Sequence, residues 1–491
     1  MPLGTIPNDI RVPLVYVEID NTGAVSGTPA QSQKLLVLGQ QTAAASVAPL
    51  SLTRITGGAS EIDALYGKGS MLSGALKAVK SANNYTECFA LGITDMDGQA
   101  AKAKVAFDGI VTQAGVVALL IAGQSVQVAM AKNADAVAIV TACVSSINQN
   151  ADLYVTASVD SGSNKSLVLT SKHKGLLGND LDVRLNYYDR EVLPAGIIAT
   201  ITPFSGGAGT PDMTDIIAQL GDEWFNHIIM PWSDTQSLNT LRDELTLRWG
   251  PLKMIEGLAY TAFRGTHSET GTFGETRNDH LITCMGTNKA PNPTWEWAAS
   301  YGATAAKSLG VDPARPLQTL VLNGILAPSK AIAWDMVERN LLLHDGIATY
   351  QVTPGGSVAI EREISMYRVN AFGDVDPSYL DITTTATLGY LRYSLKSMVT
   401  SSFPRHKLAS DDVLANIDPS QPIVTPKLMR QAILALALEW VNNGLIEGYE
   451  QFADSLQVSR DSGDVNRLNV LMHPDCVNQL RILAALIQYK L

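Results

Sequence analysis

The chain has 491 residues, which at about 150 residues per domain suggests roughly three domains and excludes a single compact core. It carries 36 lysine and arginine residues against 47 aspartate and glutamate residues, a net charge of −11. No basic field is therefore available to attract phosphate backbones or anionic lipid, and we expect no direct binding of nucleic acid or of a membrane. Charged residues make up 17% of the chain, below the roughly 25% of an average soluble domain, so part of the surface is expected to be covered by other molecules.

The sequence shows neither a membrane span nor a secretory signal. The longest apolar candidate, 114–123, has half of the roughly 20 residues that a transmembrane helix needs. The first nine residues lack the basic and apolar segments of a signal peptide, so we expect a cytoplasmic origin. The four cysteines form no Cys-x-x-Cys pair, which predicts small buried side chains and no metal site; they are Cys88, Cys143, Cys284 and Cys476.

The N-terminal region, 1–33, is interpreted as an arm and linker. Val15, Val17 and Ile19 alternate with polar residues within 11–20, which predicts a strand. The following residues, 21–33, contain almost nothing to bury and would reach roughly 45 Å if extended. The strand can therefore either fold back on its own domain or cross to a neighbouring molecule.

An α/β core is expected to begin at residue 34 and to be interrupted by an insertion. In 34–94, two buried-strand patterns flank a helix at 70–81, which is a β-α-β arrangement. Between 95 and 188 the pattern changes to short alternating strands around one helix at 134–148. We interpret this stretch as a small α+β insertion domain.

From 189 to 346 strands and helices alternate again. The expected strands are 197–201, 227–230, 258–261, 281–285 and 317–322, and the expected helices are 214–220, 237–249, 295–309 and 329–343. Such alternation implies a mainly parallel sheet with helices on its faces. Ser329 is expected to cap the last helix, which should end before Gly346.

The C-terminal region, 347–491, is expected to have a different construction. A hairpin turns at 354–356, an apolar helix from Thr425 to Gly444 should be covered on most sides, and strands are expected at 456–460 and 468–472. The last segment, 480–491, is apolar and fits either a helical stripe or a short strand. An apolar segment is unusual at a chain end, where residues are usually polar and frayed.

Motifs of catalysis and of cofactor or metal binding are absent or incomplete. The glycine-rich stretch 205–210 stands between a strand and a helix, but Asp212 and Asp215 follow it and would repel a phosphate, so we interpret it as a capped turn. Residues 69–76 have P-loop spacing without its lysine and hydroxyl. The His-x-Glu at 267–269 lacks the paired cysteines of a zinc deaminase. We therefore predict no catalytic, cofactor-binding or metal-binding residues.

Two functions from different classes remain open at this point. The first is a structural subunit whose terminal strands join neighbouring copies by adding to their sheets. The second is an α/β enzyme that binds a small ligand at the carboxyl ends of its parallel strands. The structural subunit is favoured by three features: the N-terminal strand on its long linker, the apolar C-terminal end and the low charge content.

Several segments resemble the contractile tail sheath proteins of Mu-like bacteriophages. They are 6–14 and 18–21 near the start, 206–212 in the middle, and 466–468, 474–475 and 477–481 near the end. The resemblance runs nearly end to end. It implies a structural protein of the virion tail with an α/β and α+β multidomain fold and without a cofactor.

The same resemblance implies a mechanism and partners. Sheath subunits form hexameric rings that stack helically around a tail tube, and contraction drives the tube through the host envelope during genome delivery. The implied partners are other copies, the tail tube protein, and baseplate and tail terminator proteins. The insertion at 95–188 would lie on the outer wall. A strand is favoured for the terminal segment, and both arms would enter sheets of adjacent subunits through Val12, Leu14, Val15, Tyr16, Val17, Ile19, Leu480, Ile482, Leu483, Leu486, Ile487 and Tyr489.

Overall fold

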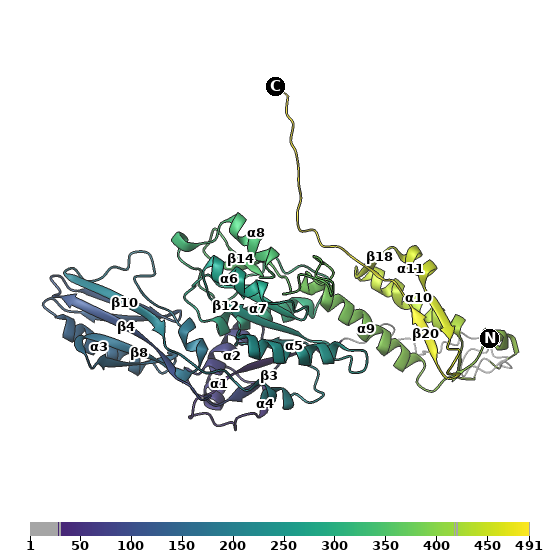
Figure 1. Cartoon of the computed structure of the whole chain (residues 1–491), viewed down its shortest axis with the longest axis horizontal. Helices are drawn as coiled ribbons and strands as arrows, with labels where there is room; N and C mark the ends of the chain where they lie inside the picture. Colours follow the sequence, from purple (N-terminus) through teal and green to yellow (C-terminus); the bar gives the residue numbers. More distant parts are fainter. Residues whose placement is uncertain (1–27, 29–30, 417, 419–420, 491) are drawn as a thin grey trace, which may run out of the picture. The chain divides into compact units, whose positions relative to one another are not determined.

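The computed structural model describes residues 28, 31–416, 418 and 421–490, and the chain divides into two compact units (Figure 1). We call residues 32–389 and 479–491 the α/β unit, and residues 1–31 and 390–478 the C-terminal unit. The predicted N-terminal strand and most of the linker after it lie outside the described residues. No helix in the described part of the chain is long and apolar enough to cross a membrane.

A six-stranded sheet forms the centre of the α/β unit, in the order β13-β12-β11-β1-β3-β2. Five strands are parallel: β1 (Lys34–Gln40), β3 (Glu87–Ile93), β11 (His227–Ile229), β12 (Leu258–Phe263) and β13 (Ile282–Gly286). Strand β2 (Leu52–Ile55) is antiparallel at one edge. Strands buried on both faces are short, nearly continuous apolar runs. The prediction of a mainly parallel sheet is confirmed.

Helices α2 (Met71–Ala82) and α7 (Thr294–Leu309) pack against this sheet and against each other. Helix α7 is buried along most of its length, and its small residues allow a close approach. A Cβ on Gly302 would stand 2.3 Å from Ile229 Cδ1 and 2.9 Å from the ring of Tyr260. The other helices of this region are α1 (Ala59–Tyr66), α4 (Met213–Ala218), α5 (Thr235–Trp249) and α6 (His267–Glu275).

In the structure, two antiparallel sheets and one helix are built from residues 100–205, and we call this part of the chain the insertion from here on. The four-stranded sheet has the order β10-β4-β8-β7 and the three-stranded sheet the order β6-β5-β9. Figure 1 shows β4, β8 and β10 beside α3. The elements are β4 (Ala100–Gly109), β5 (Gly115–Ile121), β6 (Gln124–Met130), α3 (Ala136–Gln149), β7 (Val155–Asp160), β8 (Ser163–Lys174), the 3₁₀ turn η1 (Leu176–Asp180), β9 (Val183–Leu185) and β10 (Ile197–Ser205).

The assignment of 197–201 to the parallel sheet is wrong. Strand β10 pairs antiparallel with β4, with Ile201 opposite Val105. Only part of β10 is buried, and Ile198 is 73% exposed. An edge strand with one solvated face needs less apolar surface than a central parallel strand. A prediction based on apolar content alone does not distinguish the two, so it assigned 197–201 to the wrong sheet.

The expected strand at 317–322 is also wrong as a member of the parallel sheet. The backbone amides of Thr319 and Leu322 donate to the carbonyls of Ile360 and Val358, at 2.8 and 2.9 Å. These carbonyls belong to β15 (Val358–Arg362), which forms the predicted hairpin with β14 (Thr349–Val352). The stretch therefore lies along the hairpin and not beside β13.

Helix α8 (Met336–His344) begins later than the predicted residue 329. Its N-cap is Asp335, which forms a reciprocal capping box with Glu338. Ser329 precedes only a 3₁₀ turn, η2 (Lys330–Ile332), and its side chain accepts no capping hydrogen bond. The predicted end before Gly346, which has a φ of +79°, is confirmed.

The C-terminal unit is built around α10 (Pro426–Asn442), which begins after Thr425 as predicted. It also contains most of α9 (Ile382–Ser402), β16 (Lys407–Leu408), η3 (Asp411–Asn416), β17 (Ile423–Val424), β18 (Ile446–Glu447), α11 (Tyr449–Ser455), β19 (Gln457–Arg460), β20 (Leu468–Leu471) and β21 (Asp475–Cys476). Trp440 is buried and donates from Nε1 to Ser394 Oγ at 2.9 Å. Leu438 is 48% exposed, so the expected cover over most of α10 is incomplete in this chain.

Candidate functional site

The carboxyl ends of the parallel strands, where an α/β enzyme would bind its ligand, are in contact with the insertion. Gln40 at the end of β1 donates to the Lys174 carbonyl at 2.9 Å. Arg264, just after β12, forms an ion pair with Asp182 at 2.6 Å. The chain's own insertion therefore contacts the edge of the sheet where such a fold usually binds its ligand.

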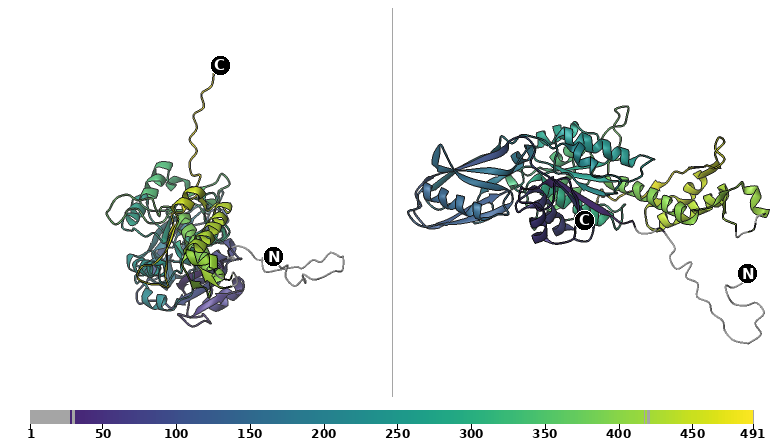
Figure 2. Two further views of the ribbon diagram at one scale, coloured as in Figure 1. Left: turned by 90° about the vertical axis from the view of Figure 1, so that its right-hand side faces the viewer. Right: turned by 90° about the horizontal axis from the view of Figure 1, so that it is seen from below.

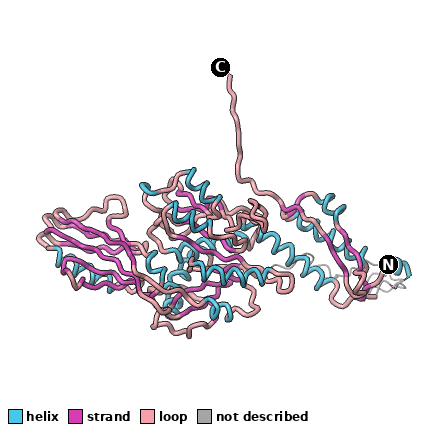
Figure 3. The backbone as a smooth tube through the Cα atoms, in the orientation of Figure 1, coloured by secondary structure: helices cyan, strands magenta, loops and turns pink. Residues whose placement is uncertain are grey.

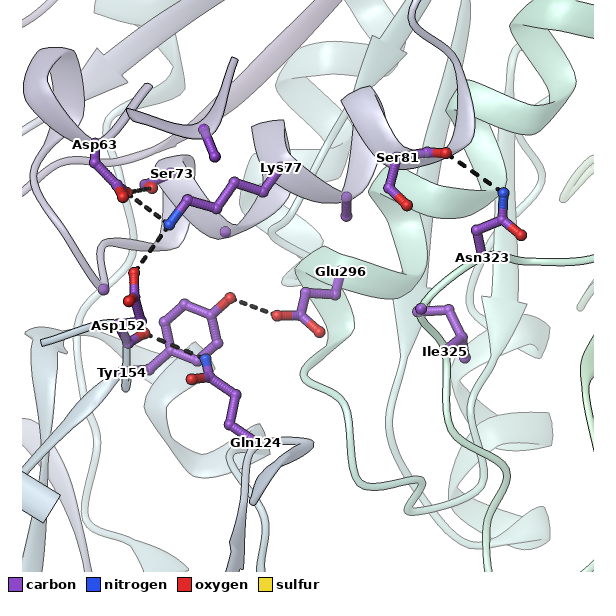
Figure 4. A pocket seen from close by; sticks show the side chains of 15 residues that line it. Asp63, Ser73, Lys77, Ser81, Gln124, Asp152, Tyr154, Glu296, Asn323 and Ile325 are labelled. Carbon is purple, nitrogen blue, oxygen red and sulfur yellow. Dashed lines mark hydrogen bonds and ion pairs between the residues drawn. The ribbon is translucent and has the colours of Figure 1, made fainter. Parts of the chain in front are cut away.

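A pocket of about 460 Å³ lies between α2, the insertion and residues 323–325 (Figure 4). Lys77 Nζ forms ion pairs with Asp63 at 2.7 Å and with Asp152 at 3.0 Å. The hydrogen bond from Lys77 holds the pKa of the Asp152 carboxyl below its usual range. Because Asp152 belongs to the insertion and Asp63 to α1, Lys77 joins the insertion to the core of the unit.

The same pocket contains a second internal contact. The buried Tyr154 hydroxyl donates to Glu296, and Asn292 Nδ2 donates to the other carboxylate oxygen at 2.6 Å. Burial raises the pKa of the Glu296 carboxyl. These polar groups are partnered with one another, so the contacts in the pocket connect the insertion to α7. In the part of the chain that the structure describes, no cluster of three or more histidine, cysteine, aspartate or glutamate residues suits a metal.

The predicted C-terminal arm residues lie on a segment without a helix or a strand. The side chains of Leu480, Ile482, Leu483, Leu486, Ile487 and Tyr489 are 74–86% exposed. Figures 1 and 2 show the segment extending away from the rest of the α/β unit, and Figure 3 draws it as loop to the end. Neither the helix nor the strand forms in this structure, and the segment pairs with no strand of its own described chain, so its pairing with another copy stays a prediction. The corresponding N-terminal residues, 12–19, lie outside the described part.

Ion pairs of Arg481 anchor the beginning of this segment to the α/β unit. Arg481 contacts Glu363 Oε1 at 2.6 Å and Asp381 Oδ1 at 3.1 Å, and Arg362 shares Asp381 at 3.2 Å. Glu363 is fully buried and also accepts the backbone amide of Leu317 at 2.9 Å. Beyond Arg481, residues 482–490 form no hydrogen bond with a described residue. The segment is thus anchored at one point and unpaired after it.

A second exposed element lies in the C-terminal unit. Strands β19 and β20 form an antiparallel pair, and no third strand joins it among the described residues. Val470 and Leu471 on β20 are 40% and 51% exposed. A two-stranded sheet is marginally stable by itself, although here α10 packs on β19. The sequence predicted both strands, but nothing in the pattern showed that the sheet would stop at two.

Known proteins match the chain over nearly its whole length. The model of the phage tail sheath protein central domain matches residues 206–366, and that of the phage tail sheath C-terminal domain matches 374–490. The Mu-like prophage FluMu tail sheath protein of Haemophilus influenzae is 45% identical over 485 residues, which are 99% of this chain and 98% of that protein.

Similar solved structures carry related descriptions. The sheath tail protein of Desulfitobacterium hafniense has a TM-score of 0.47 at 11% identity, covering 94% of this chain and 100% of that one. The sheath tail protein of Listeria innocua has a TM-score of 0.49 at 11% identity, covering 92% and 94%. A chain of the anti-feeding prophage helical sheath in its contracted state has a TM-score of 0.49 at 11% identity, covering 98% and 100%.

Proposed function

The chain belongs to the phage tail sheath protein family, and on this premise we propose that it polymerises as stacked hexameric rings around a tail tube. It is a sheath subunit of a contractile, phage-like tail. The family is structural, so the enzyme alternative is set aside. We place the protein in the tail of a virion, with the tube protein and the baseplate and terminator proteins as its partners, and contraction of the stack would drive the tube through the host envelope.

The observation that carries the assembly proposal is the terminal segment 482–490. It is apolar and exposed, yet it is attached firmly at Arg481. Burying one leucine or isoleucine side chain stabilises a contact by roughly 1.5–3 kcal/mol, so a segment with four of them gains much by entering a neighbouring copy. Extended backbone would supply ladder hydrogen bonds in the same step.

The β19–β20 pair supports the role of acceptor for such a strand. It has only two strands in the described chain, and Val470 and Leu471 of β20 expose apolar surface. An added strand would extend a marginal sheet and cover an edge that is otherwise prone to uncontrolled pairing. We propose that strands from the arms of adjacent copies, 1–33 and 480–491, complete this sheet, and that the insertion faces the outer wall.

Truncation tests the arms directly. Removal of 482–491 should leave a folded, soluble subunit that forms no long tubes in negative-stain electron microscopy. Removal of 1–20 should have the same effect. A matched control changes Gln488 to lysine, which keeps the apolar side chains, and it should still give striated cylinders. Normal contractile tubes from either truncated chain would contradict the arm assignment.

The two sides of the segment can be separated by point changes. In an extended strand Leu483 and Ile487 point to the same side, whereas Gln488 points to the other. Replacing Leu483 and Ile487 together by serine should raise the concentration needed for tube formation by at least about tenfold, because two buried side chains are lost. Unchanged assembly would show that this side of the segment is not buried in a partner.

A further inference from the structure

Residues 369–376 form a tight loop with an apolar tip on the α/β unit. Val369 and Val375 form an antiparallel bridge, and Asn370 Oδ1 accepts the backbone amides of Phe372 at 2.9 Å and of Asp374 at 3.1 Å. Phe372 is 91% exposed and Val375 is 88% exposed. The loop is thus held in one shape while its aromatic side chain points into solvent.

The same loop carries only negative charge. Asp374 and Asp376 flank Val375, and no lysine or arginine occurs between 369 and 379. Asp376 accepts the Tyr367 hydroxyl at 2.7 Å and the Ser378 amide at 2.9 Å. These two donors hold the pKa of the Asp376 carboxyl below its usual range, so it is charged at neutral pH.

A pocket of about 410 Å³ with the opposite character lies near the end of α7. Its apolar lining includes Val311, Leu320 and Val321, and Val311 is 83% exposed. Lys307 and Arg315 are the charged residues of the lining, and neither forms an ion pair with another described residue. The pocket therefore combines apolar side chains with two cationic side chains that have no carboxylate partner among the described residues.

We propose that the 369–376 loop of one copy docks into this pocket of a second copy. Phe372 enters among Val311, Leu320 and Val321, while the two aspartates face Lys307 and Arg315. Aromatic side chains prefer desolvated pockets at interfaces, and opposite charges at the rim set orientation and exclude wrong partners.

The geometry of this contact suits a polymer. The loop and the pocket are different surfaces of the same chain, so copies joined head to tail through this contact form rings or open helical arrays. The inference rests on the proposed function, because it takes another sheath subunit as the occupant. It adds a contact between α/β units to the strand exchange of the arms.

Charge reversal tests the docking. Asp374→Lys and Arg315→Glu, made singly, should each raise the concentration needed for tube formation by about tenfold, since each places like charges together. The chain that carries both changes should recover most of the wild-type assembly. Asp189→Lys, an exposed site on the insertion, makes the same change in net charge as Asp374→Lys and should assemble normally. Circular dichroism of each variant verifies folding.

The outcomes separate the docking from the function on which it rests. Normal assembly of both single variants, or a double variant no better than either, overturns the docking while wild-type tubes leave the proposed function standing. A wild-type chain that never assembles overturns both. Replacing Phe372 by serine supplies a charge-neutral check and should weaken assembly by a similar factor.

Discussion

Replacing Arg481 by alanine should destabilise the α/β unit strongly, because the change leaves the Glu363 carboxylate buried without its counterion. Arg481 contacts Glu363 at 2.6 Å, and the two side chains are 11% and 0% exposed. Removing one partner of a buried ion pair costs about 3–5 kcal/mol. Glu363 keeps the Leu317 amide and Asp381 keeps Arg362, so we expect a loss near the lower end of that range.

Urea unfolding of dissociated subunits, followed by tryptophan fluorescence, measures this loss. Arg54→Ala is the matched control: Arg54 pairs with Glu87 at 2.8 Å, but its side chain is 63% exposed, so about 0–1 kcal/mol is expected. Adding Glu363→Gln to Arg481→Ala should restore most of the stability, since a neutral amide can still accept the Leu317 amide. An Arg481→Ala chain as stable as the Arg54→Ala control, or a double variant without recovery, would refute the reasoning.

Three further predictions concern the interior. Burial lowers the pKa of His227 from 6.5 to about 3, so between these two pH values the histidine is protonated in the unfolded chain and neutral in the folded chain. The free energy of unfolding should therefore decrease as the pH falls through this range, by at most about 5 kcal/mol. In urea titrations, His227→Gln should flatten that part of the curve of stability against pH. Asp335→Ala should lower stability by about 1 kcal/mol through loss of the α8 cap, whereas Ser329→Ala should change it little, as thermal unfolding will show. Gly302→Ala should cost about 1–3 kcal/mol by overpacking, whereas Gly355→Ala, whose added Cβ would meet only Thr353 Oγ1 at 3.9 Å, should be nearly neutral in the same assay.

The sequence predicted the parallel sheet because its strands are apolar on both faces. The apolar runs alone identify these segments as strands without information on which strands they pair with; they are β1, β3, β11, β12 and β13. The failures at 197–201 and 317–322 concern pairing. Both stretches are apolar, but one pairs with β4 and the other lies along β15, and such choices depend on the whole fold.

Helix α9 was missed for a different reason. It begins Ile382-Thr-Thr-Thr-Ala-Thr-Leu-Gly, and β-branched residues and glycine are poor helix formers. In the structure Thr383, Thr385 and Thr387 are buried, and the Thr387 hydroxyl donates to the Thr383 carbonyl at 2.8 Å. Tertiary burial outweighs the weak intrinsic propensity, and the bond to the Thr383 carbonyl satisfies the buried Thr387 hydroxyl.

For the C-terminal segment, the sequence predicted the apolar composition but not the ion pairs that anchor it at Arg481. The apolar end of the chain is visible in the sequence, and its side chains are exposed in this structure, whereas its entry into a neighbouring copy stays a prediction. The arginine that holds it is separated from Glu363 by 118 residues, and no local pattern connects them. The N-terminal residues assigned to the other arm remain a prediction.

The ion pairs of Arg481 determine which part of the molecule bears a mechanical load applied to the C-terminal segment. After the hairpin of β19 and β20 the chain leaves the C-terminal unit at Asn478 and is tied to the α/β unit three residues later. If segment 482–490 enters a neighbouring copy as proposed, tension on it would be borne first by the carboxylates of Glu363 and Asp381, next to β15 and at the start of α9. In the proposed array, the mechanical load would pass from the α/β unit of one copy to the β19–β20 hairpin of the next, so each hairpin would be loaded by the segment of a neighbouring copy and not by its own.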